Sequence, residues 1–192
     1  MDSCTDSLTL RPMSRHLNAH RLNMKAFAHE GAALVESTPL PSLERLALEA
    51  HELPSGAAAS WEARGELRPS PGAEDAIWLH LKAHAVVPLT CQRCMAAVAT
   101  PLHVDQWFRF VDSEDIAMAE DDQSEEDLLV MEPQFDLLAL VEDELVMALP
   151  LVPMHEHCPN PPVLSAGDDE IAVPDTEKPN PFAVLAQLKG KK

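Results

Sequence analysis

The sequence predicts an α+β fold in which a small antiparallel sheet carries one long amphipathic helix, preceded by N-terminal helices. Residues 76–89 and 97–111 alternate apolar and polar side chains, which is typical of half-buried antiparallel strands. Residues 136–149 repeat their apolar side chains with the period of a helix. A length of 192 residues and a hydrophobic content of 46% allow one domain with a buried core and tails.

The N-terminal part combines a basic segment with two short helical patterns. Residues 1–25 contain a cluster of Arg and Lys side chains, and we expect this segment to be flexible. Residues 27–37 and 40–51 have helical character, and a proline-containing break separates them. We expect a single α+β domain to extend over residues 26–158.

The strand patterns lie on both sides of the two central cysteines. Residues 57–69 give a weak strand pattern, and the two clear strands at 76–89 and 97–111 follow it. Cys91 and Cys94 lie between the two clear strands. We therefore expect both cysteines at the tip of a β-hairpin.

The region after the second clear strand is strongly acidic. The net charge of the chain is -18, and no Lys or Arg occurs between Arg109 and Lys178. We expect residues 112–127 to form a disordered acidic loop. A field this negative repels nucleic-acid phosphates, and the three tryptophans are not interleaved with a basic stripe along the sequence. Direct RNA binding is therefore electrostatically disfavoured, and a basic protein partner or a solvated loop fits the charge better.

The clearest helix pattern is "FDLLALVEDELVMALP". Residues 128–133 before it fit a short strand, and Asp136 is expected to cap the helix. Pro150 is expected to end it, while Glu142 and Asp143 are expected to face water. The predicted apolar face, which packs on the sheet, consists of Leu138, Val141, Leu145 and Leu149.

The remainder of the chain is predicted to be a disordered linker and a short docking segment. Residues 159–178 have the composition of a disordered linker. Residues 179–192 fit a helix too short to be stable alone, so we expect it to dock on a partner or on the fold itself. The expected docking residues are Pro179, Asn180, Pro181, Phe182, Leu185 and Leu188.

The CxxC pair can bind a metal or remain as two reduced thiols. Zinc needs two further ligands, and "HEHC" offers Cys158 together with His155 or His157. We prefer His155, because it and Cys158 repeat the two-residue gap of Cys91 and Cys94. These four residues would hold one structural zinc, and the alternative is a turn with no metal.

Catalytic chemistry has little support in the sequence. A thioredoxin-type CxxC lies at a helix N-terminus, whereas this pair lies between two strand patterns, so a thiol oxidoreductase is the weaker alternative. No GxSxG, HExxH or glycine-rich phosphate loop occurs, and we predict that the protein is not an enzyme. A cytoplasmic location is expected, because there is no secretory signal pattern and no apolar run of about 18 residues.

Three motifs in a fixed order carry a family resemblance. They are "LTCQRCM", then "FDLLALVEDELVMALPLVPMH" followed by "HC", then "KPNPFAVLAQLK". Over residues 86–188 the chain resembles the YceD family, the large ribosomal RNA subunit accumulation proteins. The resemblance implies a non-enzymatic role in the synthesis, processing or stability of large-subunit (23S) ribosomal RNA, and thus in ribosome biogenesis.

The charge adds an expectation about the partner, and one departure from the family bears on the metal. We expect a basic ribosomal or rRNA-processing protein as the partner, because it would complement the acidic chain. Many family members carry more cysteines after the long helix, whereas this chain has only Cys158 there. A structural-zinc interaction module with another role is the alternative function.

Overall fold

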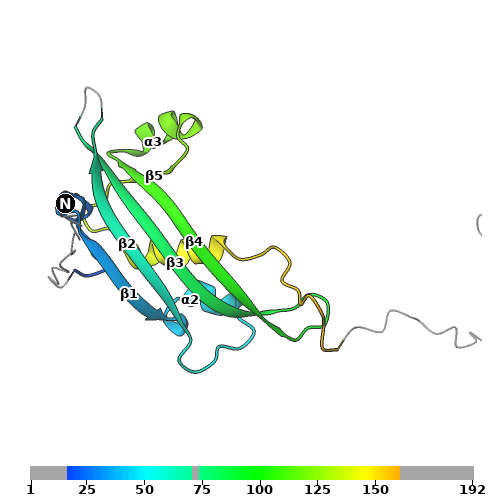
Figure 1. The fold of residues 1–192 in the computed structure, drawn as a ribbon. Coiled ribbons are helices and arrows are strands. Elements are labelled where there is room, and N and C mark those ends of the chain that lie inside the picture. Colours follow the sequence, from blue (N-terminus) through cyan, green and yellow to red (C-terminus); the bar gives the residue numbers. More distant parts are fainter. Residues whose placement is uncertain (1–16, 71–73, 161–192) are drawn as a thin grey trace, which may run out of the picture. The chain divides into compact units, whose positions relative to one another are not determined.

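The computed structural model describes residues 17–70 and 74–160, which form a five-stranded sheet with associated helices (Figure 1). The strands are β1 (Ala33–Pro39), β2 (Ala58–Arg68), β3 (Ala76–Thr90), β4 (Ala97–Val111) and β5 (Asp127–Val130). The helices are α1 (Met24–His29), α2 (Glu44–Glu49), α3 (Glu114–Glu120) and α4 (Leu137–Met147), with 3-10 turns η1 (Leu40–Ser42) and η2 (Asp121–Gln123). The predicted α+β class is confirmed.

The sheet is mostly antiparallel. Strands β1 to β4 pair in chain order as an antiparallel meander, and β5 runs parallel to β4 at the other edge. This parallel edge strand differs from the purely antiparallel sheet expected. It forms because α3 and η2 carry the chain back along the sheet before β5 begins, and parallel strands need such a crossover.

The β3–β4 hairpin is the longest pairing in the sheet. It runs from Ile77 opposite Phe110 to Thr90 opposite Ala97. The next residues form the hairpin tip, so the predicted position of the CxxC pair is confirmed.

Alternation along β2, β3 and β4 sends one set of side chains into the core, where α1, α2 and α4 cover them. Burial of these apolar side chains is the main stabilising contribution. The buried indole of Trp61 donates from Nε1 to Thr38 Oγ1 at 2.9 Å, so its polar group is satisfied. Fully buried side chains include Leu22, Phe27, Leu43, Leu79, Leu81, Phe108 and Leu145.

The expectation of one helical segment at residues 27–37 is wrong in its second half. Asn23 caps α1 by accepting from Ala26 N at 3.0 Å, and the helix ends before Gly31, whose φ is +57°. The residues beyond this left-handed glycine form β1. The buried Leu22 pairs with Phe135 through two backbone hydrogen bonds of 2.8 and 2.9 Å, so the end of the basic segment 1–25 contacts the core.

The acidic segment 112–127 was expected to be a disordered loop, and this expectation is wrong. Ser113 caps α3 by accepting from Ile116 N, which starts a helix within the segment. Arg109 on β4 then binds Glu120 at 2.8 Å and Glu126 at 2.6 Å. One arginine therefore holds both ends of the turn between α3 and β5.

The cap predicted for α4 is confirmed, because Asp136 accepts from Ala139 N at 2.9 Å. The buried face differs from the predicted one, since Leu138 and Leu149 are only half-buried. The residues of α4 that are buried are Leu137, Leu140, Val141 and Leu145.

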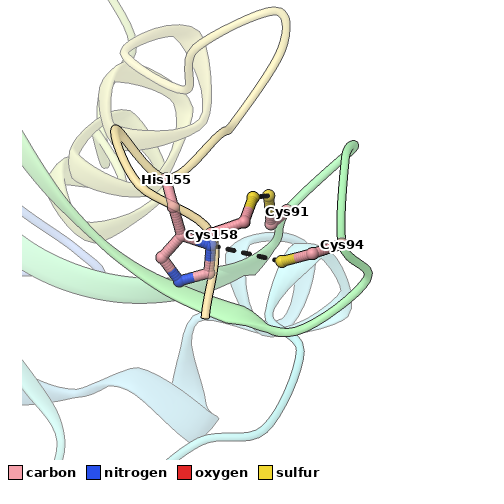
Figure 2. Close-up of side chains that lie close together, drawn as sticks. All are labelled: Cys91, Cys94, His155 and Cys158. Atoms are coloured by element: carbon pink, nitrogen blue, oxygen red, sulfur yellow. Dashed lines mark hydrogen bonds between the residues drawn. The ribbon is translucent and has the colours of Figure 1, made fainter. Parts of the chain in front are cut away.

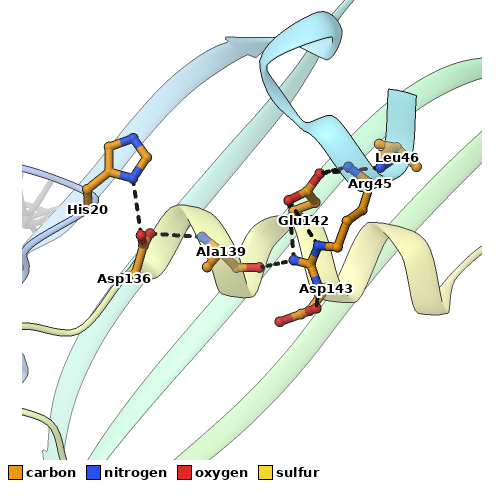
Figure 3. A network of polar contacts seen from close by, with 7 residues as sticks. All are labelled: His20, Arg45, Leu46, Asp136, Ala139, Glu142 and Asp143. Carbon is orange, nitrogen blue, oxygen red and sulfur yellow. Dashed lines mark hydrogen bonds and ion pairs between the residues drawn. The ribbon is translucent and has the colours of Figure 1, made fainter. Parts of the chain in front are cut away.

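Glu142 was expected to face water, and this is wrong. Its side chain is only 13% exposed, and its carboxylate accepts from Arg45 N at 2.7 Å and from Leu46 N at 3.3 Å (Figure 3). The Arg45 side chain binds both Glu142 and Asp143. These contacts join the first turn of α2 to α4, and they satisfy N–H groups that a helix start leaves unpaired.

The predicted linker lies almost wholly, and the docking segment 179–192 wholly, outside the described residues, as do residues 1–16. In residues 17–70 and 74–160, no helix is both long and apolar enough to cross a lipid bilayer.

Gly65 on β2 lies directly under α1. A Cβ at this position would lie 2.6 Å from Phe27 Cδ1 and 3.0 Å from the backbone of Ala28. We therefore expect Gly65→Ala to lower the free energy of unfolding by about 1–3 kcal/mol, as measured by urea denaturation. Ser60→Ala on the exposed face of the same strand is the control and should change stability little. Equal stability of the two variants would contradict this packing.

Candidate metal centre

Two loops form the candidate site. One is the tip of the β3–β4 hairpin, and the other is the segment after α4, residues 148–160. Gln92 N donates to Pro153 O at 2.9 Å, which holds the two loops side by side (Figure 2). Within the tip, Met95 adopts a left-handed φ of +60° and donates its N–H to Cys91 O at 2.9 Å. This tight turn lets both thiols of the CxxC pair face the second loop.

The four residues expected to bind metal lie together. Their ligand atoms are all within 4.8 Å of one another, and Figure 2 shows the side chains pointing toward a common centre. Cys91 Sγ lies 3.8 Å from Cys158 Sγ, and Cys94 Sγ lies 3.5 Å from His155 Nδ1. In a tetrahedral zinc site, bond lengths of about 2.0–2.3 Å place neighbouring ligands about 3.5–3.8 Å apart. These two distances therefore fit zinc.

The histidine of the group is held in the tautomer that a metal needs. His155 Nε2 lies 3.0 Å from Ala97 O, and a carbonyl can only accept, so Nε2 carries the proton. The lone pair of Nδ1 is then free to point at the three thiols. Such a hydrogen bond on the second ring nitrogen is a common feature of metal-binding histidines. The alternative ligand, His157, lies outside the group.

Arg93 binds the second loop. Its Nε donates to Cys158 Sγ at 2.9 Å, and its Nη2 donates to His155 O at 2.9 Å and to Glu156 O at 3.3 Å. Sequence reasoning missed this role, because it depends on residues more than 60 positions away. The only signal was the basic side chain between the two cysteines.

The thiols have different acidities. Burial raises the pKa of Cys91, but N–H groups of His155, Cys94 and Arg93 stabilise its thiolate and bring the pKa to about 5. The Ala96 N–H lowers the pKa of Cys94, but burial and the neighbouring Cys158 and Cys91 outweigh it and raise the pKa. A cation at the centre would relieve this competition between thiolates.

The arrangement fits a structural centre better than a catalytic one. Three thiols and one imidazole are the ligands of a closed tetrahedral zinc site, which leaves no position for water or substrate. Redox chemistry is less well supported, because the CxxC pair lies in a hairpin tip and not at a helix N-terminus. In the part of the chain that the structure describes, no second group of metal-binding side chains converges in this way.

The outward face of the sheet carries an aromatic cluster that the sequence did not reveal. The Arg68 guanidinium lies 4.0 Å from the ring centre of Trp78 and 4.1 Å from that of Trp107. His80 stacks on Trp107 at 4.0 Å. The strands thus interleave tryptophans with basic groups that are far apart in the sequence.

Three basic side chains of this face are paired with acidic ones. Arg68 binds Glu66, while His80 and Lys82 both bind Asp105 at 2.6 and 3.5 Å. These pairs reduce the positive charge that the face offers to a phosphate backbone, which argues against a nucleic-acid site.

Comparison with known proteins identifies one matching family, and the match begins in β3 and extends past the described residues. The sequence profile of "Large ribosomal RNA subunit accumulation protein YceD" matches residues 79–189. A protein of that name from Haemophilus influenzae is 42% identical over 117 residues. That alignment covers 55% of this chain and 61% of the relative, so the chain spans about three fifths of the relative's length. No solved structure matches the chain.

The low pKa of Cys91 can be tested in metal-free, reduced protein. We expect one thiolate to form near pH 5, well below the ordinary thiol pKa of about 8.5, because the N–H groups around Cys91 favour its ionised form. Thiolate absorbance in the ultraviolet measures this titration, and Cys91→Ala should remove the low-pH step. Since the folded-state pKa is lowered, stability should fall as the pH drops from about 8.5 to about 5. Titration of every thiol near the ordinary value would refute the assignment.

Proposed function

The chain belongs to the YceD family, because the family profile matches more than half of the chain. We propose that the protein supports the accumulation of large-subunit ribosomal RNA. The observation that carries the proposal is the match over residues 79–189, which includes β3, β4, α4 and the metal-centre loops. We propose that the role is non-enzymatic and cytoplasmic. A closed ligand set without room for a substrate supports the non-enzymatic role.

We further propose that Cys91, Cys94, His155 and Cys158 hold one structural zinc ion. Zinc would supply a tetrahedral crosslink between the hairpin tip and the loop after α4. The ligand separations, the His155 tautomer and the low pKa of the Cys91 thiol support it. The alternative function predicted from the sequence is a structural-zinc interaction module with another role. That module would use the same metal centre, so bound zinc would not by itself identify the biological process.

The proposed partner is a basic ribosomal or rRNA-processing protein. Residues 112–144 contain fourteen acidic side chains and no Lys or Arg, which favours a positively charged protein over RNA. The C-terminal segment 179–192, with the apolar residues Phe182, Leu185 and Leu188, is proposed as a second docking element on the basis of its sequence.

The two histidines of "HEHC" provide a matched test of the metal. Protein purified without added zinc should contain about one zinc per chain, and His155→Ala should lose most of it because one of four ligands is gone. His157→Ala removes a histidine outside the ligand group and should keep the metal. Metal content is measured by elemental analysis of purified protein.

Three results of that experiment would count against the proposal. Metal-free wild-type protein that cannot take up added zinc would reject the site. Equal zinc loss in His155→Ala and His157→Ala would reject this ligand set. Reversible disulfide exchange at Cys91 and Cys94, with no metal, would favour the thiol oxidoreductase.

The role in ribosomal RNA can be tested by complementation. In cells that lack the gene for this chain, the ratio of large- to small-subunit ribosomal RNA should fall, and the intact gene should restore it. Restoration should be weaker with His155→Ala, or after deletion of residues 179–192, than with His157→Ala. Quantitative hybridisation to both RNAs measures the ratio.

An unchanged ratio in cells without the gene would reject the proposed role. Full restoration by the deletion variant, at normal protein level and solubility, would reject the docking segment alone. The two proposals are therefore separable.

A further inference from the structure

A groove lies between α3, β5 and α4, at the end of the sheet away from the metal centre. Its volume is about 430 Å³, and its apolar surface comes from Leu129 on β5, Phe135 before α4, and Leu140 on α4. Two contacts hold Phe135 in place. Its ring packs edge-on against the ring of Phe110, with 5.1 Å between the ring centres, and its backbone forms hydrogen bonds with Leu22. The groove is therefore built on rigid elements.

Every charged residue known to line the groove, in the described part of the chain, is acidic. These residues are Glu114 on α3, Glu132 after β5, and Asp136 and Asp143 on α4. Asp136 binds His20, and Asp143 binds Arg45, but Glu114 and Glu132 have no ion pair among the described residues. Among the residues that the structure describes, no Lys, Arg or His lines the groove.

The surrounding field is also negative. Burial raises the pKa of Glu144, and repulsion from Asp127 and Asp143 raises it further. The nearby cation Arg109 already forms ion pairs with Glu120 and Glu126. An apolar groove in such a field attracts positive charge and excludes phosphate.

We infer that this groove docks a short segment of a basic protein, in which a large apolar side chain is flanked by Lys or Arg. The apolar side chain would bury against Phe135 and Leu129, and the flanking cations would face Glu114 and Glu132. The inference rests on the proposed function, because it names the surface through which the basic partner would act. Nucleic acid fits less well, because the groove offers no cation to a phosphate.

Three fluorescent peptides test the inference with the full-length protein. The first is Lys-Arg-Leu-Phe-Lys-Arg, the second replaces its two central residues by Ser-Ser, and the third replaces its four basic residues by Glu. We expect the first alone to bind clearly by fluorescence anisotropy, and its affinity should fall as salt is raised.

Matched variants then locate the binding surface. Glu114→Gln with Glu132→Gln removes two charges from the groove and should weaken the first peptide about five- to tenfold at low salt. Glu36→Gln with Glu62→Gln removes the same charge from exposed positions outside the groove and should change affinity less than about twofold. Ala139→Arg places a cation at an exposed position of the groove and should abolish binding. Circular dichroism of each variant confirms folding.

Two results of the peptide experiments would show that the groove does not dock such a segment. Equal weakening by the two double variants would mean that only the net charge attracts the peptide. Equal binding of the Ser-Ser peptide would mean that the apolar groove takes no part. Either result overturns the inference.

The same experiments can also show that the groove binds something other than a basic protein segment. A single-stranded RNA that binds wild-type protein but not Ala139→Arg would replace the protein segment as occupant. A dimer that Ala139→Arg dissociates would make the occupant a second copy. Both overturn the inference. Groove variants that restore ribosomal RNA fully, while losing the peptide, would also overturn it and leave the proposed function intact.

Discussion

The rest of the structure depends on the antiparallel pairing of β3 with β4. Its fourteen residue pairs fix which side chains of both strands face the helices and which face outward. If β4 slipped by one residue against β3, its two faces would exchange, so the core would lose Phe108 while Trp107 turned inward. The same register sets where the hairpin ends, and so decides that the two cysteines lie at its tip. One pairing thus determines the core, the outer aromatic cluster and the position of the turn that carries two of the candidate ligands.

The two candidate sites lie near opposite ends of this hairpin. The metal centre follows the pair Thr90–Ala97, while β5 and the groove adjoin the last residues of β4. Fourteen extended residues span about 45 Å along the hairpin, and α4 is the element that connects the groove to the loop of the metal centre. The acidic residues between positions 112 and 144 include all the charged residues among the described ones that line the groove.

The parts of the fold that depend on local pattern could be predicted from the sequence. The period-two alternation predicts β3 and β4, and Asp136 predicts the start of α4. The spacing of the Cys and His residues predicts the four candidate ligands. Contacts between distant segments could not be predicted. Ser113 and Arg109 turn an acidic stretch into α3, although its composition alone suggests a loop. Arg45 buries Glu142, although helical periodicity places that residue on the polar face. In both cases an arginine outside the segment binds its acidic side chains, and the pattern of the segment alone does not reveal that contact.

The loop after α4 has little structure of its own. It contributes no strand to the sheet, and among its described residues only Ala148 and Leu149, at its start, pack against the apolar core. Its described ties to the hairpin tip run through the candidate ligands, Arg93 and Gln92. A zinc ion bound as proposed would therefore fix this loop to the hairpin tip, and its loss would free one short segment and leave the sheet folded. Such segments form separate cooperative units with their own opening free energy. Cellular zinc supply would then control the order of residues 148–160, while the domain that carries them would remain unchanged.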